Sequence, residues 1–393
     1  MLSILQHPLV FPLILACVMI VAFPLIAGYI VLAERKLLGD FQVRLGPMRV
    51  GPHGVLQPLA DALKLLLKED LQPAGSDRFI FWMAPCISTF TALTALSVVP
   101  FTQQVRVADV NVGLLVISSM SAVGVLGVVL GGWSANSHYA LLGTLRGGAQ
   151  LISYEVALAF ALLNGVMMAG TLSMTGIVAA QQQRGVWFAF ENYGLMLVPF
   201  VMYLIAAVAE TNRAPFDLPE AESELVAGFM TEYSGFRWAL YFLAEYCNIF
   251  VIASVAVTLF WGGWLRPFPS VVWLEYPLDY AFPLVLMALS GLLCLRMAQR
   301  LKNRPRALFL AVLAVGLVFF GLVFVIPPVN HALIGLFWFL LKVWVIIYAI
   351  IWFRATWPRF RYDQLMSLGW KRLIPLGMAV VLINAVVGMV KGA

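Results

Sequence analysis

The sequence predicts an all-α polytopic membrane protein that forms a single transmembrane domain over residues 1–393. The chain is 62% hydrophobic and only 11% charged, with a mean hydropathy of +0.92. This composition excludes an ordinary soluble domain. Apolar runs of about 18 to 24 residues recur, and each is long enough to cross a bilayer core as a helix. The uneven placement of Lys and Arg between the runs supports the same class.

We expect about ten transmembrane helices, one for each apolar run. The runs lie near 9–32, 79–100, 110–131, 149–170, 187–209, 239–261, 281–298, 307–327, 333–353 and 373–391. The first run has no basic segment before it and no small-residue cleavage site. We therefore interpret it as a retained span and not as a signal peptide.

Basic residues gather on one side of the predicted membrane. If the amino terminus lies outside, the outer loops and tail hold only Arg106, Arg184, Arg266 and Lys391, and the inner loops hold most of the other Lys and Arg residues. This bias predicts that both termini lie on the outer side. The net charge of +6 thus reflects topology, and we expect membrane lipid and no nucleic acid as a partner. Nothing resembles a transit peptide, which favours a bacterial inner membrane.

The sequence offers no pattern for a redox centre. The four cysteines (Cys17, Cys86, Cys247 and Cys294) stand singly within predicted spans, and no Cys or His spacing fits an iron–sulfur cluster or zinc. We expect no iron–sulfur cluster, flavin or metal on this chain. Any electrons must then be carried by another molecule.

The first inner segment, 33–78, contains a second type of helix. Over residues 53–70 the apolar side chains fall on one face, and Asp61 lies among the polar residues of the opposite face. Such a helix is too short and too amphipathic to span, so we expect it to lie in the membrane interface. The alternative is a surface helix that only anchors the loop.

The same segment groups charges where the first span ends. Glu34, Arg35 and Lys36 are followed by Arg44 and two Gly-Pro turns. Arginines beside an amphipathic helix suit a portal between bilayer and protein, because they offer fork-shaped donors to a polar head group. The alternative is plain phospholipid anchoring.

Three ionisable residues occur inside predicted spans, namely Glu155, Glu245 and Lys342. Each costs on the order of 2.5 to 3.5 kcal/mol at a helix centre. Membrane proteins usually keep such groups for a proton or ion path. The alternative is a satisfied ion pair that ties helices together.

The inner segment 210–238 is rich in acids, and the sequence around its start reads AETNRAPFDLPEAESELVAGF. Its six carboxylates are Glu210, Asp217, Glu220, Glu222, Glu224 and Glu232. Prolines stiffen this loop and apolar residues interrupt the charges, which indicates a loop packed on the membrane domain rather than a freely solvated one. Crowded carboxylates titrate together, so the loop is predicted to load and release protons.

These segments resemble the quinone-site membrane subunit of proton-translocating NADH:quinone oxidoreductase, respiratory complex I. The matching motifs are AERKLLGDFQVRLGP, GPHGVLQPLADALKLLLKED, GGWSANSHYALLGTLRGGAQLISYEVALA, AETNRAPFDLPEAESELVAGFMTEYSGFRWALYFLAEY and WFRATWPRFRYDQLM. They occur in order and cover most inner loops and several spans. The resemblance implies a translocase subunit without a redox centre of its own.

The resemblance also implies roles for particular residues. Residues Glu34, Arg35, Lys36, Arg44 and Asp61 would line the entrance of a tunnel for quinone, either ubiquinone or menaquinone. The acids Glu155, Glu210, Asp217, Glu220, Glu222, Glu224, Glu232 and Glu245, together with Lys342, would form a proton relay. The implied partners are soluble iron–sulfur and quinone-site subunits on the inner side and proton-pumping subunits in the membrane.

The chain departs from this family in one respect. The family usually has eight spans, and the surplus here is a hairpin over 281–327 joined by the basic sequence RLKNRPR. An added pair of spans preserves the orientation of the spans after it. Because no acid occurs in its spans, we expect the hairpin to be peripheral and lipid-facing.

Three other functions compete with this assignment. A membrane component of an energy-converting hydrogenase would work without quinone, but the first inner segment argues for a quinone portal. A free-standing ion transporter predicts inverted repeats, and none is seen. A purely structural anchor leaves the three intramembrane charges unexplained.

Overall fold

The computed structural model describes residues 10–220, 222–300 and 304–391. Every regular element within these ranges is a helix, so the predicted all-α class is confirmed. In the described chain, nine helical stretches are long and apolar enough to cross a membrane. They contain α2 (Val10–Phe41), α4 (Arg78–Ser97), α5 (Gly113–Ser134), α6 (His138–Ala169), α10 (Gly235–Phe260), α11 (Phe282–Arg300), α12 (Arg304–Val323), α13 (Pro327–Thr356) and α15 (Ile374–Lys391).

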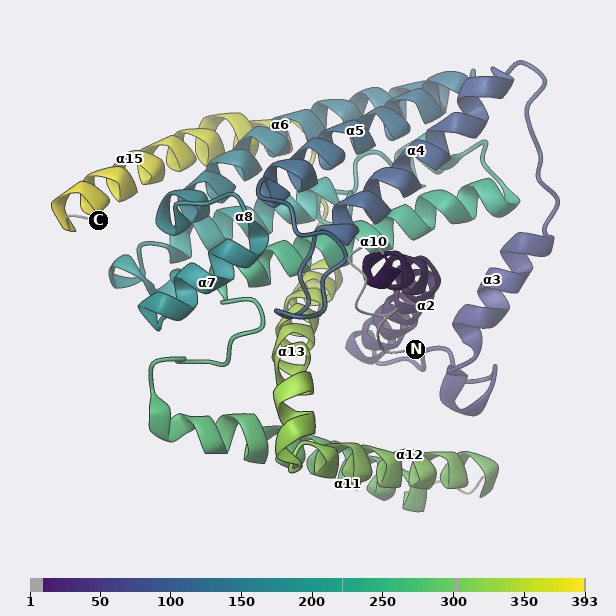
Figure 1. The fold of residues 1–393 in the computed structure, drawn as a ribbon. Helices are drawn as coiled ribbons and strands as arrows, with labels where there is room; N and C mark the ends of the chain where they lie inside the picture. Colours follow the sequence, from purple (N-terminus) through teal and green to yellow (C-terminus); the bar gives the residue numbers. More distant parts are fainter. Residues whose placement is uncertain (1–9, 221, 301–303, 392–393) are drawn as a thin grey trace.

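Shorter helices connect these spans. They are α3 (Gln57–Leu67), α7 (Met174–Arg184), α8 (Leu197–Glu210), α9 (Glu222–Leu225) and α14 (Tyr362–Leu368), with single turns such as η1 (Pro52–Gly54). In Figure 1, α4, α5 and α6 lie side by side, and α15 runs beside α6. Helix α10 packs against α4 and α13 and is the most enclosed of the spans.

The run predicted as a span over 187–209 contains only the 14-residue helix α8. The backbone before it turns through the left-handed region at Asn192, Tyr193 and Gly194, with φ values of 51°, 57° and 82°. Such a turn ends any continuing helix. At 1.5 Å per residue, α8 is about 21 Å long, shorter than a bilayer core of roughly 30 Å.

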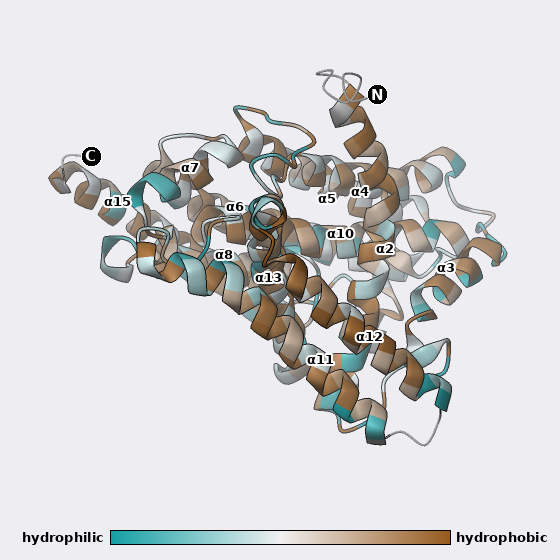
Figure 2. Cartoon of the chain, turned by 60° about the horizontal axis from the view of Figure 1, so that its bottom comes forward, coloured by the Kyte–Doolittle hydropathy of each residue, from teal (hydrophilic) through white to brown (hydrophobic). Residues whose placement is uncertain are grey.

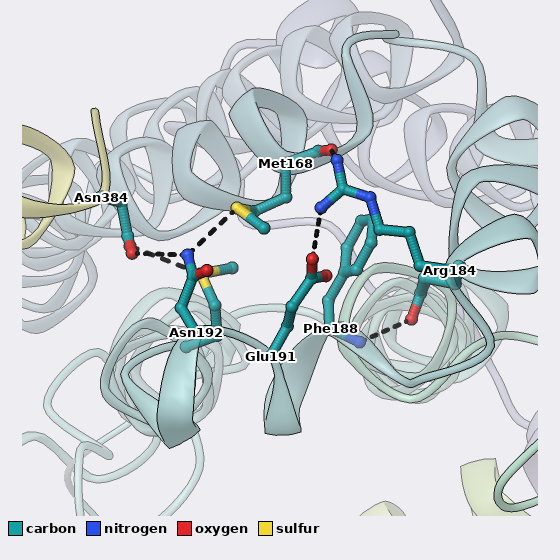
Figure 3. Close-up of polar contacts among 8 residues, drawn as sticks. Met168, Arg184, Phe188, Glu191, Asn192 and Asn384 are labelled. Atoms are coloured by element: carbon teal, nitrogen blue, oxygen red, sulfur yellow. Dashed lines mark hydrogen bonds and ion pairs between the residues drawn. The ribbon is translucent and has the colours of Figure 1, made fainter. Parts of the chain in front are cut away.

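Polar contacts fix this irregular segment against its neighbours (Figure 3). The Arg184 guanidinium at the end of α7 lies 2.5 Å from a carboxylate oxygen of Glu191 and donates to the Met168 carbonyl at 2.6 Å. The side-chain amide of Asn192 contacts that of Asn384 on α15 at 3.4 Å. The segment 185–196 is thus held by side chains instead of by helical hydrogen bonds.

The predicted hairpin is formed by α11 and α12, which pack mainly against each other (Figure 1). At its outer end, Arg266 pairs with Asp279 at 2.9 Å, and the Trp338 indole donates to the same carboxylate at 3.1 Å. At its inner end, α12 contacts η1. Most of the hairpin surface is apolar (Figure 2). The hairpin is therefore peripheral along its length, but its inner end touches the first inner segment.

Candidate functional site

Helix α2 continues to Phe41, beyond the predicted span, so the charges of the first inner segment lie on a helix. The Arg35 guanidinium lies 2.8 Å from an Asp61 oxygen, and the Gln57 amide donates to the other oxygen at 2.8 Å. This pair lines an open cleft of about 310 Å³ together with Lys64 and Trp238. The structure therefore brings two of the predicted portal residues into direct contact.

Helix α3 has the amphipathic character that the sequence predicts. Its leucines Leu59, Leu63 and Leu66 are at least half exposed, whereas Asp61 on the other side meets α2. An apolar face of this kind, left uncovered within the chain, suits contact with the membrane interface.

The remaining portal residues point in different directions. The Lys36 ammonium donates to the His53 carbonyl at 2.5 Å and so fastens the turn before α3. Arg44 lies on the exposed loop after α2, where it donates to Gln42 at 2.7 Å. Arg44 is therefore outside the Arg35–Asp61 contact.

Glu34 is buried and joins three helices. Its carboxylate accepts from the Tyr246 hydroxyl of α10 at 2.7 Å and is paired with Arg354 at the end of α13. The sequence prediction placed Glu34 in an exposed portal. The two partners were missed, although Tyr246 directly follows the predicted intramembrane Glu245 in the sequence.

A second buried ion pair continues from this point. The Arg213 guanidinium lies 2.9 Å from a Glu245 oxygen, and both side chains are less than a tenth exposed. The same guanidinium stacks over the Tyr246 ring, 4.5 Å from its centroid. Glu34, Tyr246, Arg213 and Glu245 thus form one contiguous polar chain that starts beside Arg35.

An internal cavity of about 100 Å³ lies at the other end of this chain. Three of the predicted relay acids line it, from α8, the acidic loop and α10, together with hydroxyl and amide side chains. The lining includes Glu210, Glu220, Glu245, Ser121, Tyr241 and Asn248. Ser121 donates a hydrogen bond to Glu210. A cavity with several polar partners is suited to hold water.

Burial raises the pKa of Glu220 well above its usual range. The negative charges of Glu245 and Asp217 raise it further, and the positive charges of Arg213 and Arg354 lower it. Since a raised pKa favours the neutral acid, Glu220 is a group that readily keeps a proton near neutral pH.

The acidic loop is held against α6 by its backbone. The buried Gln150 amide donates to the carbonyls of Ala209 and Phe216 at 2.7 and 2.8 Å. A Cβ atom at Gly143 would lie 2.8 Å from the Pro219 carbonyl oxygen and from the Gly228 Cα atom. The loop can approach the helix this closely only because glycine occupies that position.

Other predicted relay acids lie outside the cavity lining. Glu155 on α6 is close enough to Glu210 for their charges to interact. Glu224 lies at the surface, where Arg146 at 2.7 Å holds its pKa below the ordinary value. Glu232 borders a separate surface cleft. The Glu222 side chain lies outside the described residues.

Lys342 occupies a different environment from these acids. Its ammonium donates to the carbonyls of Trp261 and Leu265, both at 2.7 Å, and lies 4.5 Å from the centroid of the Trp187 ring. These carbonyls follow the end of α10. Lys342 therefore satisfies backbone groups that the end of a helix leaves unpaired.

The side chains of the described residues include no group of three His, Cys, Asp or Glu that could hold a metal ion. The chemistry that the site offers is that of ion pairs, hydroxyl groups and carboxylic acids that exchange protons.

The glycine contact predicts a stability effect. We expect Gly143→Ala to destabilise the protein by about 1 to 3 kcal/mol, because the new methyl group meets backbone atoms of the acidic loop that cannot rotate away. The nearby Gly148→Ala is the matched control, since its Cβ would meet only Val129 at 3.4 Å. The apparent midpoint of thermal unfolding of the purified protein measures both. Equal midpoints for the two variants would contradict the packing argument.

The sequence matches the NADH dehydrogenase family over residues 14–385. It is 68% identical over 387 residues to the second H-type subunit of the NADH-quinone oxidoreductase of Solibacter usitatus, with 98% of each chain covered. It is 51% identical over 373 residues to the first H-type subunit of the enzyme of Koribacter versatilis, covering 91% of this chain and 86% of the relative. The H-type subunit of the Magnetococcus marinus enzyme is 41% identical over 375 residues, covering 95% and 90%.

These matches extend over nearly the whole chain, including α2, the acidic loop and α10. They confirm the family resemblance inferred from the inner-loop motifs. The chain therefore belongs to the family of H-type membrane subunits of NADH-quinone oxidoreductase, respiratory complex I.

Proposed function

We propose that this complex I membrane subunit forms part of the quinone-binding tunnel and couples quinone reduction to proton translocation. The observation that supports the proposal is the contiguous chain of contacts from the Arg35–Asp61 pair through Glu34, Tyr246 and Arg213 to Glu245. One end of this chain lies at an open cleft, and the other borders the internal cavity.

The portal end is suited to sense a polar quinone head group. Arg35 and Asp61 are each between a third and a half exposed, so a ligand can reach their hydrogen-bonding groups. A charge change at the head group would alter the field at Glu34, which directly precedes Arg35 on α2. Glu34 has alternative partners in Tyr246 and Arg354, so it can transmit this change to α10.

The buried end would convert the change into proton binding. While Arg213 contacts Glu245, the carboxylate is stabilised as an anion. If Arg213 moves toward Glu34, the unpaired Glu245 carboxylate binds a proton, because an isolated charge in a dry interior is strongly unfavourable. Glu210, Glu220 and Glu155 would then exchange protons with Glu245 through the cavity as a coupled group. Asp217, Glu222, Glu224 and Glu232 would supply protons from the inner surface.

The remaining assignments belong to the same proposal. The quinone would be ubiquinone or menaquinone, reduced next to soluble iron–sulfur and quinone-site subunits on the inner side. Protons would pass to pumping subunits in the membrane. The positive-inside bias supports a bacterial inner membrane with both termini on the outer side.

The portal is tested by Asp61→Asn. We expect quinone reduction by the purified complex to fall about three- to tenfold, mainly through a higher KM for quinone, because Arg35 loses its charged partner. Asp109→Asn is the control, since Asp109 forms a comparably exposed pair with Arg106 far from the cleft. An unchanged KM in Asp61→Asn would remove Asp61 from the portal.

The relay is tested by Glu245→Gln, which keeps an oxygen for Arg213 but cannot exchange a proton. We expect an assembled complex whose proton pumping and turnover fall about tenfold or more. Glu191→Gln serves as the control, because Glu191 is paired with Arg184 away from the cavity. A normal proton yield per electron pair in Glu245→Gln would exclude this residue from the path.

Lys342 is tested separately, because its contacts differ from those of the acids. We expect Lys342→Met to lower the midpoint of thermal unfolding, since two buried carbonyls lose their donor at about 1 to 3 kcal/mol each. We also expect the proton yield of the assembled variant to be retained. A reduced yield with an unchanged midpoint would instead make Lys342 a member of the relay.

A further inference from the structure

The inner end of the α11–α12 hairpin contains a cluster of basic residues without acidic partners. Arg296, Arg304 and Arg306 form no ion pair within the described residues. No Asp or Glu occurs in the sequence between Asp279 and Asp363. The hairpin itself therefore cannot neutralise these charges, and a counter-anion has to come from another molecule.

An apolar cleft lies beside these arginines. It measures about 700 Å³ and opens between the inner ends of the two helices. Its lining includes Leu295, Ala298, Arg304, Ala307 and Leu308. Figure 2 shows the apolar bodies of α11 and α12 with hydrophilic residues at this end. A ligand that fits has an apolar chain and an anionic head.

A third observation comes from the neighbouring turn η1, which α12 contacts. The His53 side chain is nine-tenths buried, and its Nε2 atom has no hydrogen-bond partner within the described residues. Burial lowers the pKa of His53, and the positive charges of Lys36 and Arg306 lower it further. An anion beside Arg306 would compensate the positive charge that surrounds this imidazole.

We propose that the inner end of the hairpin, with Arg304 and Arg306, binds an anionic phospholipid of the inner leaflet. One acyl chain would occupy the cleft, and the phosphate would accept hydrogen bonds from the guanidinium groups, whose planar fork matches phosphate oxygens. Basic pockets between membrane helices on the inner side commonly hold anionic head groups. The choice of leaflet rests on the proposed membrane orientation, and the binding itself does not depend on quinone chemistry.

The site places a lipid next to the quinone portal. Helix α12 contacts η1, and η1 is fastened to α2 by the bond from Lys36 to the His53 carbonyl. The bound lipid would therefore stabilise the turn from which α3 starts. This gives the additional hairpin a ligand-binding role in addition to its apolar contact with the bilayer.

The test is photo-crosslinking of the purified complex, reconstituted in phosphatidylcholine, with a phosphatidylglycerol that has a diazirine in its acyl chain. We expect labelled peptides from 295–311, and we expect unlabelled phosphatidylglycerol to compete far better than phosphatidylcholine. The double variant Arg304→Gln/Arg306→Gln should lower the labelling about tenfold or more. Arg304→Lys/Arg306→Lys should retain most of it, because the charge is kept.

Arg372→Gln is the matched control, since it removes an exposed basic residue of the inner side from a different helix. Intact assembly of each variant is checked by its subunit composition. Equal competition by both lipids would show ordinary bilayer contact and overturn the proposal. Absence of lipid labelling, with crosslinks to another subunit instead, would assign the hairpin end to a protein interface and would also overturn it.

Discussion

The inner half of this subunit depends on the ion pair between Arg213 and Glu245, because both groups are buried in the protein interior. An unpaired charge there would be strongly unfavourable, and breaking such a pair costs about 3 to 5 kcal/mol. Helix α10 supplies the carboxylate, and the acidic loop must bring the guanidinium to it. The tight turn from Arg213 to Phe216, the Gln150 clamp and the close contact at Gly143 all place Arg213 at this position.

The same constraint explains why acids of the site have different environments. Glu34 and Glu245 each have a positive partner, whereas Glu220 borders the cavity, where burial and neighbouring carboxylates outweigh the nearby arginines and raise its pKa. Groups that keep a charge and groups that keep a proton therefore lie next to one another. A small displacement of Arg213 changes which carboxylate is compensated, so one movement can redistribute several protons.

Much of the architecture can be predicted directly from the sequence. Long apolar runs predict helices because the backbone must satisfy its own hydrogen bonds in lipid, and nine such stretches are found in the described chain. The run before α8 was the exception. Its composition is apolar enough for a span, but Asn192, Tyr193 and Gly194 adopt a left-handed turn that hydropathy does not register.

The site was only partly predictable for a related physical reason. Acids inside apolar runs are conspicuous, so Glu155 and Glu245 stand out from the sequence. Their partners are not, since Arg213 lies 32 residues from Glu245 and Arg354 lies 320 residues from Glu34. Only the folded chain shows which charges meet. The pairing also separates Glu34 from Arg35, two neighbours that the sequence assigned to the same portal.

These two neighbours provide the argument for coupling through rigid contacts. On a helix, successive residues point about 100° apart, so Arg35 faces the cleft while Glu34 faces the interior. Any rotation or shift of α2 that accompanies ligand binding at Arg35 must also move Glu34 against Tyr246 and Arg354. Because those partners belong to α10 and α13, the response reaches two enclosed helices at once, and neither the quinone nor a proton has to cross the distance between the portal and the cavity.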